Sequence, residues 1–397
     1  MMKWENRDLG RLPVKSWCDQ VESGALKQAV NLANHPRTVG HIALMADCHL
    51  GYGMPIGGVI GCDEAIIPNA VGVDIGCGMC AVRTSFPVAE LNRHQISECL
   101  AEVERQVPTG EGNCHRQPQS WDRFEELPSW LDAHARERAR RSLCTLGGGN
   151  HFLEMQAGDD GHLWLMLHSG SRNLGYRIAE HYHRLAVDFC ERRKIKLPAS
   201  DLAYLDTESM TGRDYIRDMK VALAFACENR ARMMTVFRDV VARVLQHVTF
   251  LDEINIHHNY ATPEMHFGRE LWIHRKGATS AKEGEQGIIP GSMGTKSYIV
   301  RGNGNPESFF SCAHGAGRRM GRMAASRTLS KAACDKAMAG IVHSGWRSFR
   351  GGGGKMKGVL DLSEAPQAYK DIEAVVDASS DLARPIMGLR PLGVVKG

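Results

Sequence analysis

The chain has 397 residues, of which 43% are hydrophobic and 24% are charged, and its formal net charge is +4. These proportions are those of an ordinary globular protein, and they exclude a disordered chain, a coiled coil and a collagen-like repeat. No apolar stretch approaches the ~18 residues of a membrane span, and the start, MMKWENRDLG, has no hydrophobic signal region, so we expect neither membrane insertion nor secretion.

The first half of the chain predicts short strands between long helices. Apolar residues recur at helical spacing over Lys15–Asn34 and Val88–Val107. Short apolar runs between turn residues predict strands at His41–Met45, Val59–Ile60 and Ala81–Thr84. The polar stretch Pro108–Pro128 is rich in Pro, Gly and Gln and predicts an exposed loop.

The second half begins with a predicted β-hairpin and continues with helices. The hairpin strands are His151–Met155 and Leu163–His168, with a turn at Gly158–Gly161. Helical spacing then predicts two helices, Asn173–Arg193 and Tyr215–His247.

Further strands and short helices are predicted towards the C-terminus. The strands are Leu271–His274, Ser297–Arg301 and Ser308–Ser311, and helices follow Gly317 and surround Ala368–Val376. Length alone favours two to three domains at about 150 residues each. Because strands and helices do not alternate strictly and no linker divides the chain, we instead predict an α+β fold. It is a single compact domain over residues 1–397, with mixed sheets and peripheral helices.

Glycine and cysteine are unusually placed in the sequence. The 42 glycines are about 11% of the chain, against an average of ~7%, and they gather beside His, Cys and Asp. The 12 cysteines are expected to be free thiols in a reducing cytoplasm, because no secretion signal precedes them. The mild positive charge permits a nucleic-acid partner without arguing for one.

The segment AVGVDIGCGMC places the carboxylate of Asp74 three residues before the thiol of Cys77, among glycines that let the backbone bend. Carboxylate, thiolate and imidazole ligands together suit a borderline divalent ion such as Mn²⁺, Zn²⁺ or Co²⁺. Taken alone, this segment favours the alternative of a buried structural cysteine in a tight turn. Cys80 completes a CxxC pair, a weak indication of redox activity without a thioredoxin-like setting.

Histidines occur at three predicted strand-to-loop junctions. In LGGGNHFLE, His151 follows three glycines and Asn150, and in LHSGSRNLG, His168 ends a strand. INIHHNYA adds His257 and His258. Each histidine alone is more often an ordinary polar residue, but binding residues concentrate on loops of a rigid scaffold. Together they predict a site.

Phosphate-binding groups are predicted in two glycine-rich segments. IIPGSMGTKSY offers backbone N–H groups and hydroxyls, without the spacing of a Walker A loop. SCAHGAGRRMGR places His314 before a predicted helix start, with Arg318 and Arg319 in the first turn, which favours an anion site. His314 either attacks phosphorus to form a phosphoramidate or binds an anion without covalent chemistry. Asp47, in MADCHLGYGMPIGG, holds an ion, orients a ligand or caps a turn.

Nine segments in this order resemble the RtcB family of RNA-splicing and repair ligases. They run from residue 45 to the C-terminus and are MADCHLGYGMPIGG, VGVDIGCG, GGGNHFLE, LHSGSR, HHNYA, HRKGAT, PGSMGTKSY, SCAHGAGR and LRPLGVVKG. The resemblance implies a cytoplasmic ligase, dependent on GTP and Mn²⁺, that joins an RNA 2′,3′-cyclic phosphate or 3′-phosphate end to a 5′-hydroxyl end. It implies tRNA or ribosomal RNA fragments as substrates and archease as a candidate activating partner. The alternatives are a metal-dependent RNA-end phosphohydrolase without ligation and a catalytically inactive RNA-binding relative.

The resemblance also implies roles for individual residues. Two Mn²⁺ ions would be held by Asp74, Cys77, His151, His168 and His258. His314 would take up GMP and pass it to the RNA 3′-phosphate, giving an RNA-3′-pp-5′-G intermediate. The guanylate would be bound by Asn150, Glu154, Ser292, Ser297, Ala316, Gly317, Tyr369 and Lys396. Asp47, Arg172 and Arg318 match further active-site positions, whereas residues 108–128 and 194–210 match no segment of the family.

Overall fold

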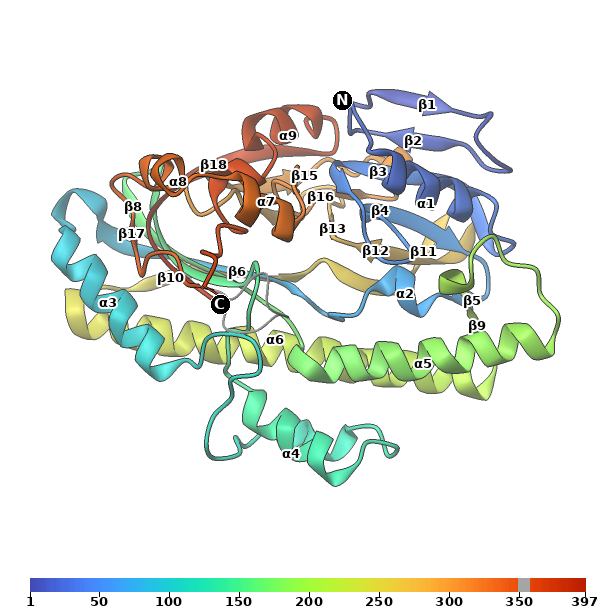
Figure 1. The fold of residues 1–397 in the computed structure, drawn as a ribbon, viewed down its shortest axis with the longest axis horizontal. Helices are drawn as coiled ribbons and strands as arrows, with labels where there is room; N and C mark the ends of the chain where they lie inside the picture. Colours follow the sequence, from blue (N-terminus) through green and yellow to red (C-terminus); the bar gives the residue numbers. More distant parts are fainter. Residues whose placement is uncertain (349–357) are drawn as a thin grey trace.

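Two large β-sheets form the centre of the computed structural model, which describes residues 1–348 and 358–397 (Figure 1). The first sheet has six strands in the order β1-β2-β3-β4-β12-β11. Their bounds are Trp4–Asn6, Val14–Ser16, Thr38–His49, Ile56–Cys62, Arg269–Lys276 and Asn259–His266. The pairing of β2 with β3 is parallel and the other pairings are antiparallel, so the sheet is mixed.

The second sheet has eight strands, and His151, His168, His257 and His258 lie in its strands or directly beside them. Its main path is β10-β6-β8-β7-β18-β15-β14, and β17 pairs with β18 in parallel. In that path order the bounds are Phe250–His257, Gly78–Pro87, His162–Ser169, Phe152–Gly158, Ala383–Lys396, Ser297–Gly302 and Gln286–Ile289, and β17 is Val342–His343. Two small pairs complete the strands, β13 (Ala278–Ser280) with β16 (Ser311–Ala313) and β5 (Ala65–Ile66) with β9 (Leu205–Asp206).

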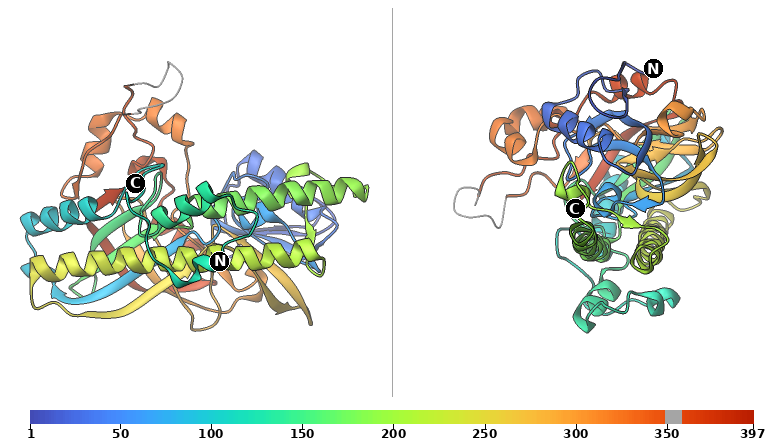
Figure 2. Two further views of the ribbon diagram at one scale, coloured as in Figure 1. Left: turned by 90° about the horizontal axis from the view of Figure 1, so that it is seen from below. Right: turned by 90° about the vertical axis from the view of Figure 1, so that its right-hand side faces the viewer.

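The helices lie around the sheets. In chain order, α1 to α9 are Ser23–Ala33, Pro68–Val71, Arg93–Gln106, Ala133–Ser142, Arg172–Arg192, Met210–Leu245, Arg322–Thr328, Lys331–Ala337 and Ile372–Ala378. The long helices α5 and α6 run side by side along one face of the molecule, and α4 lies beyond them (Figures 1 and 2). No helix among the described residues combines the length and the hydropathy that a bilayer crossing requires.

Helix α6 joins the two sheets into one domain. Ser209 accepts the backbone N–H of Gly212 and so caps the helix start. Tyr215 and Phe225, in its first half, belong to a hydrophobic cluster with residues of the six-stranded sheet. Phe237 and Val241, in its second half, pack with residues of the eight-stranded sheet. Because one continuous helix packs against both sheets, the prediction of a single compact α+β domain is confirmed.

The hairpin and the two long helices lie where the sequence predicts them. β7 and β8 form an antiparallel hairpin, α5 begins one residue before the predicted helix and α6 extends beyond its predicted start. In contrast, the predicted start of the helix Val88–Val107 is wrong. Asn92 and Gln95 form a capping box, so α3 begins only at Arg93.

The prediction of a helix over Lys15–Asn34 is wrong for its first half. Val14–Ser16 is β2, which pairs with β1 and β3, and α1 begins only at Ser23. Trp17 is fully buried and its indole N–H donates to Asp381 at 3.0 Å. Pairing and burial by distant segments therefore override the local helical spacing.

Three predictions near the C-terminal half also need correction. Ser308–Ser311 is not a strand, because Phe309 and Phe310 have positive φ angles of 53° and 52°, and β16 begins only at Ser311. The helix expected directly after Gly317 begins at Arg322 instead. The helix expected around Ala368–Val376 is α9, which begins at Ile372.

The segment 108–128 is only partly the exposed loop that its composition predicts. Phe124 and Leu127 are buried, and Phe124 packs edge-on against Trp121 and near Phe225 of α6. The guanidinium of Arg140, on α4, lies 4.7 Å from the centre of the Phe124 ring. This aromatic cluster anchors the segment to the helices.

We expect Phe124→Ala to detach this segment, because it removes a fully buried ring. Such truncations cost about 3–5 kcal/mol of unfolding free energy where the site cannot collapse. Limited proteolysis should then cut residues 108–131 much faster than in the parent protein. Asp122→Ala, an exposed change in the same turn, is the control; equal cleavage of all three proteins would contradict the anchoring role.

Candidate active site

The candidate metal ligands lie at the ends of four neighbouring strands of the eight-stranded sheet. Cys77 immediately precedes β6, which pairs with β8, the strand that carries His168. β8 pairs in turn with β7, which His151 precedes, and β10 pairs with the other edge of β6 and is followed by His258. The strand registers therefore bring these four side chains to one edge of the sheet.

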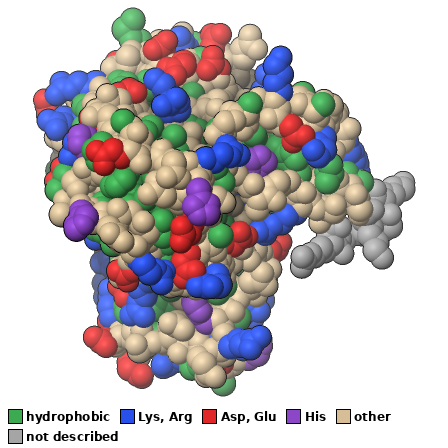
Figure 3. Space-filling view, turned by 90° about the vertical axis from the view of Figure 1, so that its left-hand side faces the viewer, with side chains coloured by type: hydrophobic (Ala, Val, Ile, Leu, Met, Phe, Trp, Pro, Cys, Tyr) green, Lys and Arg blue, Asp and Glu red, His purple; other side chains and the backbone are tan. Residues whose placement is uncertain are grey.

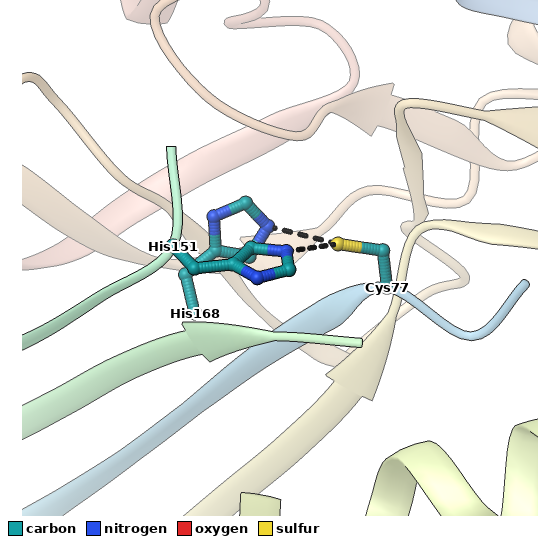
Figure 4. A group of neighbouring side chains, drawn as sticks. All are labelled: Cys77, His151 and His168. Carbon is teal, nitrogen blue, oxygen red and sulfur yellow. Dashed lines mark hydrogen bonds between the residues drawn. The ribbon is translucent and has the colours of Figure 1, made fainter. Parts of the chain in front are cut away.

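The ligand atoms of this cluster converge closely. Cys77 Sγ lies 3.2 Å from His168 Nε2 and 3.5 Å from His151 Nε2 (Figure 4). His258 Nε2 lies 3.3 Å from His168 Nε2, and Asp74 Oδ2 lies 3.4 Å from His151 Nε2. Cys77, His151 and His168 are buried, with their ligand atoms within 4.8 Å of one another, so this cluster could hold a metal ion.

Backbone carbonyls orient two of the imidazole rings. His151 Nδ1 lies 3.0 Å from the carbonyl oxygen of Leu146, and His168 Nδ1 lies 3.2 Å from that of Asn150. A carbonyl only accepts, so each Nδ1 carries the proton and each Nε2 presents a lone pair to the cluster. Burial lowers the pKa of His168 and of His258 well below the usual value, and neutral imidazole is the form that binds metals.

The acidic and thiol groups of the cluster suit a cation. Asp74 Oδ1 accepts the backbone N–H of Ser171 at 3.1 Å, which fixes the carboxylate beside His151. Burial and the nearby Asp74 charge raise the pKa of the Cys77 thiol well above its usual value. A divalent ion supplies the positive charge that stabilises a thiolate in such a place. The donor set of carboxylate, thiolate and imidazoles therefore fits a borderline divalent ion.

Arg230, on α6, lies fully buried beneath the cluster and was not identified from the sequence. Its Nη1 donates to the carbonyls of Gly76 at 2.8 Å and Ser169 at 3.0 Å. Its Nη2 lies 3.0 Å from Nδ1 of His257. His257 is thus engaged by Arg230, whereas His258 lies beside His168.

A cavity of about 660 Å³ opens beside the cluster. His168, His314 and Arg318 all line it, so the Cys–His cluster and the candidate nucleophile face one space. Most of the predicted guanylate-binding residues also line it, namely Asn150, Glu154, Ser292, Ala316, Gly317, Tyr369 and Lys396. Among the described residues, Ser297 does not line the cavity. The buried hydroxyl of Ser297 accepts the backbone N–H of Gly291 at 3.1 Å and so shapes the adjacent loop.

Glu154 places an unusual carboxyl group in the wall of this cavity. It lies on β7, is buried, and its Oε2 accepts a hydrogen bond from Gln156 at 2.6 Å. Its Oε1 has no hydrogen-bond partner among residues 1–348 and 358–397. Burial raises the pKa of Glu154 to about 8. A buried carboxyl with a free oxygen calls for a ligand that donates hydrogen bonds.

His314 is held by Asp47, which comes from the other sheet. Asp47 Oδ2 lies 2.6 Å from His314 Nδ1 and accepts the backbone N–H of His314 at 3.1 Å. Asp47 is fully buried within β3, where the pairing with β4 shifts register, so the alternative of a turn cap is wrong. The rings of His314 and His258 lie 4.7 Å apart, which places His314 directly beside the metal cluster.

The predicted helix terminus next to His314 is absent, and arginines supply the positive charge there instead. Residues 314–321 form a loop, because Gly317 (φ +72°) packs so closely on Asp47 that a Cβ would lie 2.3 Å from its carbonyl oxygen. Arg318 and Arg319 line the main cavity from this loop. Arg172 instead lines an adjoining cavity of about 430 Å³.

Glu364 is a second residue that sequence analysis missed. Its carboxylate contacts Arg318, Tyr369 and Lys396, all of which line the main cavity. Glu364 lies outside every segment of the family resemblance, and nothing in its surrounding sequence signals these contacts.

The cysteines form no disulfide among the described residues, and charged side chains of both signs are mixed on one face of the molecule. All 12 cysteines lie in the described residues and none forms a disulfide; Cys80 faces Glu253, with its sulfur 3.6 Å from Oε1, rather than Cys77. On the face that carries α3 and α8, basic and acidic side chains are interspersed (Figure 3). Arg318, Arg319 and Arg322 line the main cavity and provide positive charge at the site.

An α+β domain with a buried Cys–His cluster, a histidine held by a buried aspartate and an arginine-lined cavity defines a candidate metalloenzyme acting on phosphate groups. A family model described as tRNA-splicing ligase RtcB matches residues 28–127 and 119–397. The chain therefore belongs to the RtcB family of RNA-splicing ligases.

Individual relatives agree over the whole chain. The chain is 41% identical to the RNA-splicing ligase RtcB1 of Escherichia coli strain ATCC 25922 and 40% identical to the RNA-splicing ligase RtcB of Escherichia coli K12, with all of each chain covered. It is 30% identical to the tRNA-splicing ligase RtcB of Pyrobaculum aerophilum, over 98% of this chain and 95% of that protein.

Replacing Cys77 by Ala should weaken metal binding, because it removes the sulfur on which both imidazole Nε2 atoms converge. We expect the affinity for Mn²⁺ to fall by at least about tenfold, since even the loss of a residue that only hydrogen-bonds to a metal ligand has an effect of that order. Titration of metal-free protein followed by elemental analysis measures this. Cys80→Ala is the matched control, and equal metal binding by both variants would contradict the assignment.

Proposed function

We propose that the protein is a GTP- and Mn²⁺-dependent RNA ligase that joins 2′,3′-cyclic phosphate or 3′-phosphate ends to 5′-hydroxyl ends through a histidine–GMP intermediate. The observation that carries the proposal is His314, which is held by Asp47 and faces a cavity bordered by a metal-ligand cluster and the free carboxyl oxygen of Glu154. Residues 1–397 act as one ligase domain in this proposal.

The wall of the cavity supports guanine as the base. Guanine presents two adjacent N–H donors, from N1 and the 2-amino group, to a carboxylate, and adenine does not. The free oxygen of Glu154, together with the oxygen shared with Gln156, can accept both. Without such a ligand, the buried carboxyl stays unsatisfied, which costs free energy. GTP therefore supplies the two hydrogen-bond donors that the Glu154 carboxylate can accept, and ATP does not.

His314 is the group that we assign as nucleophile. The proximity of Asp47 to Nδ1 favours the tautomer in which Nε2 carries the lone pair. Nε2 forms a bond to the α-phosphorus of GTP while the bond from that phosphorus to the bridging oxygen breaks, and pyrophosphate leaves. The positive charge on the imidazole is then balanced by Asp47. The product is a phosphoramidate between His314 and GMP.

The later steps transfer GMP to RNA and then join the ends. An oxygen of the RNA 3′-phosphate attacks the same phosphorus, the bond to His314 Nε2 breaks, and RNA-3′-pp-5′-G forms. A cyclic phosphate is first opened by water to a 3′-phosphate. The 5′-hydroxyl oxygen then attacks the RNA phosphorus, loses its proton, and GMP leaves. We assign the binding of these phosphates to Arg318, which lines the main cavity, and to Arg172, which lines the adjoining one.

We assign two Mn²⁺ ions to Asp74, Cys77, His151, His168 and His258, whose donor atoms suit such an ion. When bound, the ions neutralise phosphate charge and polarise the phosphorus for attack. We expect tRNA or ribosomal RNA fragments as substrates, and archease as a candidate activating partner.

The covalent step gives a direct test of the proposal. Incubation with Mn²⁺ and GTP labelled at the α-phosphate should label the protein, and the label should be lost in acid but kept in alkali, as expected for a phosphoramidate. His314→Ala should lose the label completely, because the variant lacks the imidazole nitrogen that bonds to phosphorus. Label retained on this variant would refute the nucleophile assignment, and hydrolysed RNA ends without joined product would favour the phosphohydrolase.

Guanylate affinity should depend on pH through Glu154. The free carboxyl has a pKa of about 8, and guanine binding needs the carboxylate, so binding releases a proton below that pH. The affinity for GMP should therefore rise about tenfold per unit between pH 6 and pH 8 and then level off. Calorimetric titration measures it. Glu154→Gln should bind more weakly and lose the slope; a parallel slope in the variant would exclude Glu154 as its source.

A further inference from the structure

Glu364 carries a carboxylate that is only 12% exposed and lies behind the wall of the main cavity. Its Oε1 lies 3.2 Å from Arg318 Nη1 and 3.6 Å from Arg322 Nε. Its Oε2 accepts hydrogen bonds from Lys396 Nζ at 3.1 Å and from the Tyr369 hydroxyl at 2.5 Å. All four partners line the cavity, whereas Glu364 is not among its described lining residues.

The charge balance of this cluster favours a polyanionic ligand. Burial by itself raises the pKa of Glu364, but Lys396, Tyr369 and Arg318 lower it to about 2. The carboxylate is therefore charged at neutral pH. One negative charge is set against three cations, and because the cations line the cavity and the carboxylate lies behind them, the excess positive charge faces the cavity.

The partners come from separate parts of the chain. Arg318 and Arg322 follow His314, Tyr369 precedes α9, and Lys396 ends β18. Long cationic side chains lose much rotamer freedom when a ligand orders them. A carboxylate that already holds them in place reduces this cost at the moment of binding. Arg318 shows such ordering, because its Nη2 also donates to the carbonyl of Ser363 at 2.6 Å.

We propose that Glu364 is a positioning residue that holds Arg318, Tyr369 and Lys396 in the arrangement that binds the guanylate. This inference rests on the proposed function, since it assigns those three residues a ligand. Glu364 contacts neither Asp47 nor His314 among its described interactions. Its loss should therefore weaken nucleotide binding while leaving the reactivity of bound nucleotide at His314 nearly unchanged.

A second carboxylate with a largely enclosed side chain, that of Glu264 (7% exposed), provides a matched control for a purely structural role. Glu264, on β11, pairs with the buried Arg275 at 2.7 Å, and its pKa is also lowered to about 2, against burial, by His266 and Arg275. It lies outside the main cavity. Glu364→Gln and Glu264→Gln thus remove the same charge from similar surroundings, but only the former change disturbs the cavity wall.

The test compares these two variants with the parent protein. Calorimetric titration with GMP should show roughly tenfold weaker binding for Glu364→Gln, the order expected when charge-assisted hydrogen bonds lose the charge of their acceptor. The GTP concentration that half-saturates labelling of His314 should rise by a similar factor, with the maximal labelling rate changed less than about twofold. Glu264→Gln should match the parent in both measurements, even if its melting temperature falls.

Three outcomes distinguish the two proposals. If the parent protein neither binds GMP nor becomes labelled, the proposed function fails. If the parent does both and Glu364→Gln binds GMP equally well, or loses only maximal rate, the positioning role is overturned. If Glu364→Gln does not fold, Glu364→Asp replaces it: the shorter carboxylate should bind GMP with reduced affinity, and parent-like affinity would overturn the inference.

Discussion

The buried guanidinium of Arg230 is the interaction on which the geometry of the site depends. It donates to the carbonyls of Gly76 and Ser169, so it ties the turn before Cys77 to the strand that carries His168. A buried charge is tolerated only when its donors are satisfied, and this requirement makes the two backbone segments keep their separation. The Cys77 thiol lies 3.2 Å and 3.5 Å from the imidazole nitrogens of His168 and His151 in this arrangement.

The site as a whole is assembled at the junction of the two sheets. The metal-ligand cluster belongs to strand ends of the eight-stranded sheet, whereas Asp47 comes from β3 of the six-stranded sheet and reaches His314 on the loop after β16. Helix α6 packs against both sheets, so it limits how far the cluster and the Asp47–His314 pair can move apart. Under the proposed function, a charged nucleotide would lie between the Cys–His cluster and His314.

Local patterns predicted some elements well and failed where distant segments intervene. The hairpin of β7 and β8 and the helices α5 and α6 were predictable, because their turns, caps and apolar spacing are encoded within each segment. Residues 15–22 carry a helical pattern as well, yet β2 pairs with two other strands and Trp17 is buried against them. The helix expected at residues 317–321 failed for a similar reason, since the loop packs against Asp47 through Gly317.

The ordered segments rich in His, Cys, Asp and Gly were sufficient to identify the family. They also indicated which side chains line the cavity, because few residue types can bind a metal ion or a phosphate. The sequence could not reveal which groups hold them. Arg230 and Glu364 lie 153 and 287 residues from Cys77 along the chain, and each acts through contacts with segments that approach only after folding. Arginine and glutamate are also common on any surface. Arg230 is completely buried and Glu364 is only 12% exposed, so their roles come from enclosure by particular partners. Such enclosure is a property of the packed chain.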